Sequence, residues 1–527
     1  PGRGPFHLGR LVVGSEGTLA LVLEATLRVV PLPQARILAL VHFDSLLEAL
    51  EATPLLLQQG PSAVELVDRF ILDTTRNSPR FQALRQEFIQ GDPAALLMVE
   101  WSGGSAAALA DCTEAAEEAL RRAGLGWFFL RVSEPAAQSR AWSLRRGALG
   151  LSMSERGDAK AISFVEDTAV DPARLRDYIE RFLALLEEQS TTAGFYAHAS
   201  VGLLHVRPVV NLKTEAGVTQ FQRIAAAVAD LVLEFGGALS GEHGDGLVRS
   251  PFQERMFGPV LYQAFREIKR TFDPYGLFNP GKIVDAPPLT ENLRFGPNTI
   301  TRDPLTVLDF EEFGGIARAA EQCAGIGECR KRRSGTMCPS FMATRDERDS
   351  TRGRANALRQ ALAGELGGEG LASRELQQAL ELCLECKACK IECPTGVDMA
   401  RLKAEVLHHQ RRAHGLTLRD FLLSRPHVLA AFGSANPRLA NQLLASRLGR
   451  FAAHRLGLAA DRRFPQLAET PFTAPHSSDP GRARETGRWG VLFVDTFTHY
   501  FEPEVAQAAW ELMQAEGTEV VVLQGPC

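Results

Sequence analysis

The chain has 527 residues, of which 45% are hydrophobic and 23% charged, with a formal net charge of −5 and a sequence pI near 6.2. This length is typical of about three or four globular domains. The acidic balance, without a basic stripe, argues against a nucleic-acid-binding protein, and no apolar run reaches the roughly 18 residues of a transmembrane span. Few cysteines outside one region and no recognisable signal peptide favour a reducing compartment. We therefore expect a cytoplasmic protein, with peripheral attachment to the inner face of a membrane as the alternative.

The first segment, residues 9–30, alternates apolar and polar side chains as strands do, and Pro31 and Pro33 end it. Five residues, two of them glycines, interrupt the alternation. Their spacing favours a tight turn between strands, and the alternative is a contact for a phosphate or a flavin through exposed backbone N–H groups. These residues are Gly14, Ser15, Glu16, Gly17 and Thr18.

Residues 35–284 mix short apolar runs with longer amphipathic segments, which predicts an α+β domain. The clearest predicted strands are residues 37–42, 95–101 and 127–132, and the clearest predicted helices are residues 172–189 and 219–235.

Three histidines and one glutamate of this domain form a candidate metal site. His198 and His205 are seven residues apart, and Glu242 directly precedes His243. Two histidines and a carboxylate are the ligands of many catalytic zinc sites. Side chains seven residues apart on a flat strand point to opposite faces, so both histidines reach one ion only if the chain bends, and Gly202 is the predicted bend. The alternative is that they are core or surface histidines without a ligand role.

Seven of the nine cysteines lie within residues 323–393, and four of them have the spacing of an iron–sulfur motif followed by a proline. In such a run the first three cysteines bind one cluster and the fourth binds another, so an upstream Cys-Pro must complete the first cluster. We predict that a [4Fe–4S] cluster is held by Cys383, Cys386, Cys389 and Cys338.

The remaining cysteines of this region, Cys323, Cys329 and Cys393, predict a second cluster that is one thiolate short. Ile326 stands where a repeat of the first spacing would have its middle cysteine. The open alternatives are a three-iron cluster, a cluster with a ligand other than cysteine, and no cluster. A zinc site or a disulfide framework would also use cysteines grouped in this way. The arginines of residues 345–359 tune a nearby cluster, dock an acidic electron carrier or form a solvated helix face, and the acidic residues between them favour the solvated face.

The rest of the chain separates by composition. Residues 285–308 are a predicted linker, 309–414 a helical iron–sulfur domain, 415–485 a connector that is helical and then rich in Pro and Ser, and 486–527 the opening of a βαβ-type domain, with strands at 490–495 and 519–523 around a helix at 503–516.

Four segments together resemble the vanillyl-alcohol-oxidase-type flavoproteins that oxidise D-2-hydroxy acids, a group that includes D-lactate, glycolate and D-2-hydroxyglutarate dehydrogenases. The segments are residues 11–33, the segment of His198 and His205, GEHGDG at 241–246 and FDPYGLFNPGK at 272–282. The resemblance covers residues 1–284. The cysteine region and residues 490–527 are similar to the iron–sulfur half of the large bacterial members, of the iron–sulfur D-2-hydroxyglutarate dehydrogenase type.

This resemblance implies a fold: an α+β FAD-linked oxidase C-terminal domain at 35–284, an α-helical ferredoxin-like domain, and the start of an α/β Cys-Cys-Gly domain whose first motif cysteine is Cys527. It also implies that residues 1–34 are the end of an FAD-binding domain that lies mostly before Pro1.

The resemblance also implies residue roles. His198, His205 and Glu242 match metal ligands, His243 a catalytic base, and Arg145 an arginine that binds the substrate carboxylate. Residues 14–18 match a flavin-contacting loop, and Asn279 lies near the flavin. Lys160 is the nearest candidate for a further substrate-contacting lysine. Arg207 departs from the commoner pattern and, with Arg146, is a candidate for binding a second substrate carboxylate.

The implied function is flavin-dependent oxidation of a D-2-hydroxy acid to the 2-oxo acid, with D-2-hydroxyglutarate favoured because of the two candidate arginines. The implied cofactors are FAD, a divalent ion for which zinc is expected, and iron–sulfur clusters that pass electrons to a soluble or quinone acceptor. The alternatives are D-lactate as substrate, and a non-catalytic electron-transfer subunit similar to the iron–sulfur subunit of anaerobic glycerol-3-phosphate dehydrogenase.

Overall fold

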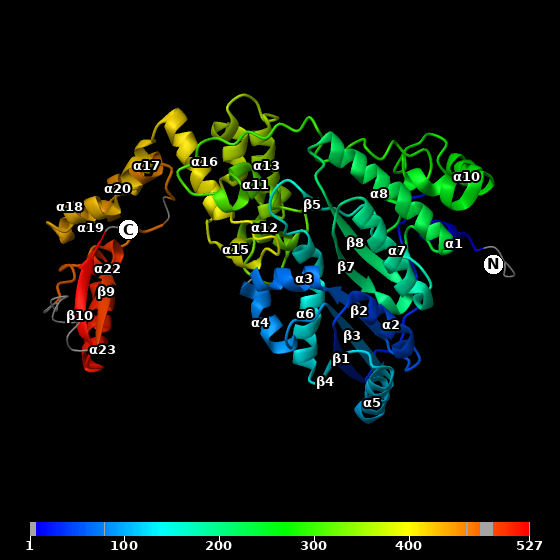
Figure 1. Cartoon of the computed structure of the whole chain (residues 1–527). Coiled ribbons are helices and arrows are strands. Elements are labelled where there is room, and N and C mark those ends of the chain that lie inside the picture. The colour runs from blue at the N-terminus through cyan, green and yellow to red at the C-terminus, as the bar shows by residue number, and fades with distance from the viewer. Residues whose placement is uncertain (1–6, 78, 460–461, 475–487, 526–527) are drawn as a thin grey trace. The chain divides into compact units, whose positions relative to one another are not determined.

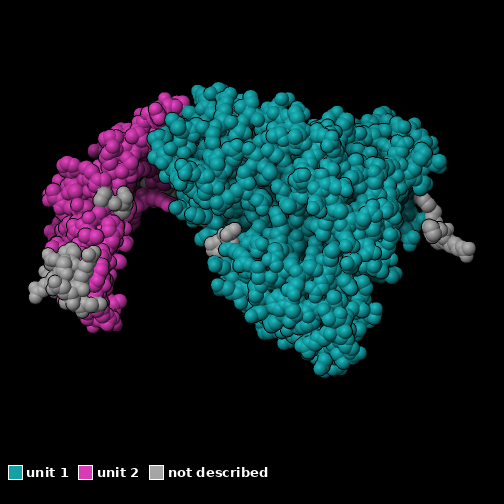
Figure 2. All heavy atoms as spheres, viewed as in Figure 1, with its two compact units in different colours: residues 1–409 teal, residues 410–527 magenta. Residues whose placement is uncertain are grey.

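The computed structural model describes residues 7–77, 79–459, 462–474 and 488–525, which fall into two compact units, residues 1–409 and 410–527 (Figure 1 and Figure 2). Among these residues, no helix combines the length and the apolar character that crossing a bilayer requires.

Unit 1 is built on an eight-stranded sheet with the order β4-β1-β3-β2-β7-β8-β5, in which β6 also pairs with β8. All of these pairings are antiparallel. The strands are β1 (Ala35–Phe43), β2 (Ala63–Asp68), β3 (Ala95–Gly103), β4 (Phe128–Val132), β5 (Lys160–Ala161), β6 (Thr168–Ala169), β7 (Ala193–His198) and β8 (Leu203–Val210). The three predicted strands are confirmed as β1, β3 and β4.

Helices cover both faces of this sheet (Figure 1). Alternate residues of β1 enter different cores, Ile37 and Val41 on one face and Leu38 and Leu40 on the other. Burial on both faces explains why the strand is continuously apolar. The first core is shared with α2 (Leu46–Leu57), α5 (Ala106–Ala123), α7 (Leu175–Glu188) and α8 (Glu215–Glu234), and the second with α3 (Arg69–Thr74), α4 (Pro79–Phe88) and α6 (Pro135–Ser152). The helices predicted at 172–189 and 219–235 are confirmed as α7 and α8.

The prediction of strands in residues 9–30 is wrong. The segment begins with α1 (Leu8–Val13), continues with a turn in which Thr18 N donates to Ser15 O, and has no regular structure from residue 20 to 33. The side chains of Leu21 and Leu23 are 73% and 88% exposed. Alternation can only form a strand where a neighbouring strand supplies hydrogen bonds, and none pairs with this segment in the part of the chain that the structure describes.

After α9 (Gly246–Arg249) and α10 (Gln253–Phe272), the predicted linker leads to a set of short helices with a core of their own. These helices are α11 (Ile316–Glu321), α12 (Pro339–Thr344), α13 (Thr351–Ala363), α14 (Arg374–Leu380), α15 (Ala388–Glu392) and α16 (Met399–His414). Cys323, Cys329, Cys338 and Cys389 are among the buried residues of this core.

The helical core and the sheet domain are held together by ion pairs. Lys213 Nζ lies 2.9 Å from Asp158 and 2.8 Å from Glu321 of α11, and Arg318 of α11 lies 2.8 Å from Asp158. Helix α6 also approaches closely, since a Cβ atom at Gly150 would lie 2.2 Å from Pro394. These contacts explain why residues on both sides of the predicted linker belong to one compact unit.

Unit 2 contains α17 (Leu418–Leu423), α18 (Pro426–Gly433), α19 (Pro437–Ala445) and α20 (Arg447–Arg455), followed by β9 (Trp489–Val494), α22 (Thr496–Tyr500), α23 (Pro503–Ala515) and β10 (Glu519–Gln524). β9 and β10 pair in parallel, so the predicted strand, helix and strand are confirmed. α22 was not predicted, and Asp495 starts it by accepting a hydrogen bond from Thr498 N. Cys527 lies outside the described residues.

Candidate functional site

The bend predicted at Gly202 is confirmed. β7 and β8 form a hairpin, and its turn is a 3₁₀ helix (Ala199–Val201) followed by Gly202, whose φ is +69°. A Cβ atom there would lie 1.8 Å from Val170 O, so both the backbone conformation and the space require glycine. Tyr196 pairs with His205 across the hairpin. Because alternate residues of a strand share a face, His198 lies on the same face as Tyr196 and His205.

The structure brings all four residues of the candidate metal site together. Glu242 Oε1 lies 3.4 Å from His198 Nε2 and 3.2 Å from both His205 Nε2 and His243 Nε2. The donor atoms of His198, His205 and Glu242 lie within 4.8 Å of one another, a separation that suits ligands of one ion. A divalent ion therefore fits between these side chains.

The two predicted histidine ligands have different environments. His198 Nδ1 lies 2.7 Å from Glu65 Oε1, and this hydrogen bond raises the pKa of His198. A carboxylate on Nδ1 fixes the ring and leaves Nε2 free for an ion, as in many metal sites. His205 is 2% exposed, and burial, followed by the charges of His198 and Arg145, lowers its pKa to about 2. Its neutral ring can offer a lone pair to a cation.

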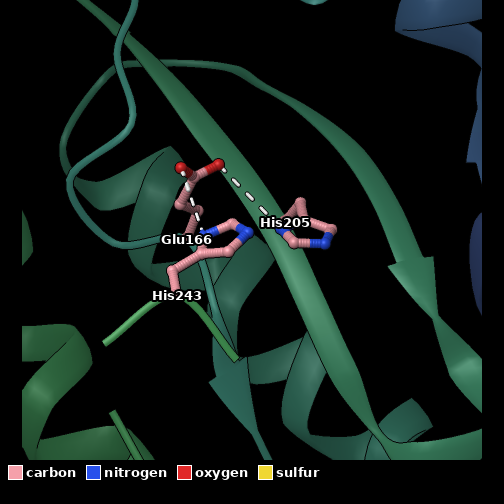
Figure 3. Close-up of side chains that lie close together, drawn as sticks. All are labelled: Glu166, His205 and His243. Carbon is pink, nitrogen blue, oxygen red and sulfur yellow. Dashed lines mark ion pairs between the residues drawn. The ribbon is translucent and has the colours of Figure 1, made fainter. Parts of the chain in front are cut away.

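Glu166 was not singled out from the sequence. Figure 3 shows its carboxylate facing the rings of both His205 and His243. Glu166 Oε1 lies 3.8 Å from His243 Nδ1 and Oε2 lies 4.0 Å from His205 Nδ1. These three residues form a second group whose donor atoms lie within 4.8 Å of one another. The only sequence signal was a pair of carboxylates directly after an apolar run.

Asp167, the next residue, holds the loop of Glu242 and His243 in place. It is fully buried and has a φ of +76°. Its carboxylate accepts hydrogen bonds from Glu242 N at 3.0 Å, His243 N at 2.9 Å and Ser240 Oγ at 2.6 Å. These bonds explain how adjacent residues can direct both side chains toward the histidines of β7 and β8.

Arg145 and Arg207 both approach the ring of Tyr196, with their guanidinium carbons 4.6 and 4.9 Å from the ring centre. Arg145 is paired with Glu65 at 2.8 Å, and its Nη2 has no well-aligned hydrogen bond among the described residues. It remains a candidate for binding a substrate carboxylate.

The contacts of Arg207 differ from those expected of a residue that binds a substrate carboxylate. It is 1% exposed and donates to Ser163, Ser152, Glu166 and Tyr196 at distances of 2.5 to 2.9 Å. These bonds use four of the five N–H donors of a guanidinium. The structure therefore does not favour Arg207 as the group that binds a second substrate carboxylate, because it already supports Glu166 beneath the site.

Lys160 also lies away from the site. It pairs with Val210 at the far end of β8, five residues from His205, which is about 17 Å along a strand. Its Nζ donates to Glu155 O at 2.6 Å, and burial lowers the pKa of Lys160 to about 8. The location is the junction with α11, so a direct contact with the substrate is not favoured.

The loop predicted to contact a flavin adjoins the metal residues. Gly246 N donates to the Glu16 carboxylate at 2.9 Å, and Asn279 Nδ2 donates to Glu16 O at 2.8 Å. Lys269 Nζ donates to Thr18 O at 2.7 Å. Three segments of the chain, residues 14–18, 241–246 and 272–282, therefore meet at one place beside the histidines.

The predicted four-cysteine set is also brought together. Cys338, Cys383, Cys386 and Cys389 line one small cavity. Arg354, which is 1% exposed, donates to Cys338 Sγ at 3.3 Å. Burial acts to raise the pKa of Cys338, but the hydrogen bond from Ser340 and the charge of Arg354 outweigh it and lower that pKa. Arg354 was predicted to lie on a solvated helix face, and its burial against a thiolate corrects that prediction.

The other three cysteines gather beside α13. Cys323 and Cys329 are buried, and Arg352 N donates to Cys329 Sγ at 3.3 Å. Burial, and then the neighbouring Cys393 and Cys329, raise the pKa of Cys323 to about 11. In the part of the chain that the structure describes, the groups of three donors within 4.8 Å of one another contain no cysteine. Thiolates around one zinc ion would be about 4 Å apart, so both sets suit a larger cluster better.

Comparisons with known proteins identify an FAD-linked domain and an iron–sulfur domain in this chain. Residues 32–283 match the family described as FAD linked oxidases, C-terminal domain, and residues 321–398 match the 4Fe-4S dicluster domain. D-2-hydroxyglutarate dehydrogenase of Pseudomonas putida is 29% identical over 98% of this chain and 56% of that protein, and the Escherichia coli enzyme of the same name is 28% identical over the same shares. D-lactate dehydrogenase of Anaerostipes hadrus is 28% identical over 53% of this chain and 58% of that protein.

The chain therefore spans about half the length of the curated relatives that it matches. Among solved structures, 4-ethylphenol oxidase from Gulosibacter chungangensis aligns with a TM-score of 0.37 and 12% identity, over 49% of this chain and 55% of that one. The family matches indicate FAD and iron–sulfur clusters as cofactors. The chain carries an FAD-linked oxidase C-terminal domain followed by a 4Fe-4S dicluster domain, and along nearly its whole length it is similar to bacterial D-2-hydroxyglutarate dehydrogenases.

Proposed function

We propose that the protein oxidises a D-2-hydroxy acid, with D-2-hydroxyglutarate as the favoured substrate, and passes the electrons through iron–sulfur clusters to a soluble or quinone acceptor. The observation that carries the proposal is the convergence of three imidazole Nε2 atoms on Glu242 Oε1 at 3.2 to 3.4 Å. The names of the relatives that match 98% of the chain support the substrate.

In this proposal His198, His205 and Glu242 hold a divalent ion, for which zinc suits the nitrogen and oxygen donors. A bound ion would supply Lewis acidity that lowers the pKa of the substrate hydroxyl. Glu65 supports the arrangement because its bond to His198 Nδ1 directs the Nε2 lone pair toward Glu242.

His243 is the proposed general base. Its side chain is 39% exposed, so a substrate hydroxyl can reach it, and its Nε2 is 3.2 Å from the proposed ligand Glu242. A proton taken from the hydroxyl at Nε2 gives an imidazolium whose Nδ1–H faces Glu166 at 3.8 Å. That carboxylate stabilises the charge and orients the ring. Arg145 binds the substrate carboxylate, and bound FAD, contacted by residues 14–18 and Asn279, would accept the hydride from Cα.

Two alternative functions are a D-lactate dehydrogenase and a non-catalytic electron-transfer subunit, and different observations bear on each. D-lactate is the substrate named for relatives that match 53% of the chain, and Arg207, the candidate for a second carboxylate, is bonded to Glu166 and Tyr196 instead. A non-catalytic electron-transfer subunit is disfavoured because it has no need of an arranged metal site with an exposed base.

The test is anaerobic dye reduction by the full-length protein that contains this chain. D-2-hydroxyglutarate, D-lactate and their L-enantiomers are compared at equal concentrations. Preference for D-2-hydroxyglutarate is the expected result. Turnover of D-lactate alone would change the proposed substrate to D-lactate. Absence of turnover with every 2-hydroxy acid would reject the proposed enzymatic function. His243→Asn should abolish substrate-dependent flavin reduction while the metal content stays unchanged.

We further propose that unit 2 attaches the protein peripherally to an anionic membrane surface at the inner face. Residues 410–463 contain ten arginines and two aspartates, although the whole chain has a net charge of −5. Helices α18 and α20 also expose large apolar side chains, with Phe432 80%, Leu448 72% and Phe451 62% exposed. Basic residues beside exposed Leu and Phe are typical of helices that lie in a membrane interface.

Cosedimentation with vesicles tests this attachment. Binding to phosphatidylglycerol vesicles that weakens with salt and is absent with phosphatidylcholine is expected. The variant Arg447→Glu combined with Arg450→Glu should lose binding, whereas Arg181→Glu, on α7 of unit 1, should keep it. Equal binding to both lipids, or none, would reject the proposal.

A further inference from the structure

The dicluster match and the cysteines of this chain disagree in number. Two clusters with four thiolates each need one more cysteine than the seven in residues 323–393. Cys112 cannot help, because it packs against the core of the sheet domain on α5. The residues of the second set therefore do not fit a four-iron cluster with cysteine ligands only.

The loop of the second set repeats the backbone of the first. In the first loop, Cys386 is flanked by Glu385 and Lys387, whose φ values are +53° and +59°. In the second loop, Ile326 stands at the same spacing and is flanked by Gly325 and Gly327, with φ of +85° and +87°. Positive φ is uncommon for residues such as Glu385 and Lys387, and the glycines of the second loop provide the same sign of φ at the same two positions. Ile326 thus occupies the place of a cluster ligand in a loop that is otherwise folded to hold a cluster.

The side chain of Ile326 faces apolar surroundings. A Cβ atom on Gly150 of α6 would lie 3.2 Å from Ile326 Cδ1 and 2.2 Å from Pro394. Ile326 and Pro394 therefore both pack on the backbone of α6 at this glycine. An isoleucine carries no donor atom for iron, and its neighbours on this side, a proline and a glycine, offer no side-chain donor either.

The three cysteines themselves are prepared to hold a cluster. Arg352 N donates to Cys329 Sγ at 3.3 Å, and the Arg352 guanidinium donates to Gly325 O at 2.9 Å within the same loop. Arg294 donates to Cys323 O at 3.2 Å. Hydrogen bonds to sulfur and nearby positive charge stabilise the anionic clusters that thiolates form.

We propose that Cys323, Cys329 and Cys393 bind a three-iron [3Fe–4S] cluster, with Ile326 in place of the fourth ligand, while the cavity of Cys338 holds a [4Fe–4S] cluster. Such a cluster would supply a one-electron acceptor. Ile326 of its loop packs on α6, the helix that also carries Arg145, so the cluster would adjoin the domain of the proposed substrate site.

Electron paramagnetic resonance of the full-length protein, purified without oxygen and then mildly oxidised, tests the proposal without any substrate. An oxidised three-iron cluster is paramagnetic, whereas an oxidised [4Fe–4S] cluster is silent. We expect the three-iron signal at one spin per chain and about seven irons per chain. Ile326→Cys should remove the signal and raise the content to about eight irons, because the loop would then supply the fourth thiolate.

Two further variants test whether the signal arises from this set of cysteines and from its missing ligand. Ile326→Val adds no ligand and should keep the signal. Loss of the signal in Ile326→Val would mean that its loss in Ile326→Cys is not explained by the added thiolate. Cys329→Ser should abolish the signal and locate it in this set. A silent oxidised wild type with about eight irons would reject the proposal in favour of a ligand other than cysteine, and one with about four irons would reject a second cluster altogether.

Discussion

Glu65 connects two side chains of the candidate site. It is 6% exposed on β2, and its two carboxylate oxygens contact His198 Nδ1 at 2.7 Å and Arg145 Nη2 at 2.8 Å. It touches neither Glu242 nor His205 through any described hydrogen bond, so its effect on a bound ion must act through the orientation of His198.

Replacing Glu65 with Gln should therefore weaken metal binding without removing a ligand. The amide cannot satisfy both His198 and Arg145, and loss of such a supporting partner typically costs 10- to 100-fold in metal affinity. Zinc competition against a chromogenic chelator measures the effect. Glu100→Gln, on the adjacent strand β3 where Glu100 accepts from Trp142, is the matched control and should keep the affinity. Equal affinity in both variants would contradict the role of Glu65.

The lowered pKa of Lys160 predicts that the free energy of unfolding depends on pH. Burial lowers its folded pKa from 10.5 to about 8, so between these values the unfolded chain binds more protons than the folded chain. The free energy of unfolding should then rise with pH from about 8 to 10.5, by at most about 3 kcal/mol. Lys160→Met should remove this rise in urea unfolding and increase stability at neutral pH. The same variant should keep its KM for the 2-hydroxy acid, and a raised KM would return Lys160 to the substrate site.

The sequence indicated most of the residues of the candidate metal site but not the residues that support them. His198, His205, Glu242 and His243 stand out because their residue types and short spacing suit metal binding. Glu65 comes from a strand that is distant in sequence from these histidines, so nothing local to their motif pointed to it. Arg207 had the right charge for a substrate carboxylate, yet burial against Glu166 decides its role, and burial could not be seen in the sequence.

At the scale of elements, the β7–β8 hairpin places the two histidines, and its turn depends on one glycine. Gly202 has a φ of +69°, and a Cβ atom there would lie 1.8 Å from Val170 O. Gly236, which follows α8, has a φ of +68° with no atom within 4 Å of an added Cβ. The two glycines share the backbone conformation and differ in the space around them.

Gly236→Ala should cost only the left-handed strain, about 1 kcal/mol. Gly202→Ala adds a clash with a backbone oxygen that cannot rotate away, so we expect a loss of several kcal/mol together with displacement of His198 and His205. Thermal unfolding compares the two variants, and zinc binding should fall only in Gly202→Ala. Similar stability losses in both variants would show that the hairpin can shift to make room.

The prediction of helices and strands succeeded where apolar residues are dense. It failed where the formation of a strand depends on pairing with a neighbouring strand. β1 and β3 were predicted correctly because most of their residues are buried on both faces, and β4, a partly exposed edge strand, because its residues are still mostly apolar. Residues 9–30 alternate just as well, but alternation does not reveal whether a neighbouring strand exists, and the segment is largely exposed. α22 was missed because it has only five residues and depends on the cap at Asp495.

At the scale of the whole molecule, the proposed electron transfer would depend on the junction between the sheet domain and the cysteine domain. Asp158 bonds both Lys213, at 2.9 Å, and Arg318, at 2.8 Å. The contacts with these cations lower the pKa of Asp158 to about 2, with the hydrogen bond from Arg318 as the largest cause. The carboxylate is therefore charged at neutral pH and separates two positive groups.

Asp158→Asn should loosen this junction. The two cations would then face each other with the more distant Asp303 and Glu321 left to compensate, and a hydrogen bond to a charged group contributes about 1.5 to 3 kcal/mol. We expect faster protease cleavage within residues 285–308 and slower reduction of an acceptor that takes electrons from the clusters, while dye reduction directly at the flavin stays unchanged. Asp177→Asn, whose side chain is 69% exposed on α7, is the control and should resemble the wild type. Unchanged cleavage and acceptor reduction in Asp158→Asn would mean that the close contact of Gly150 with Pro394 holds the two domains together without the ion pairs.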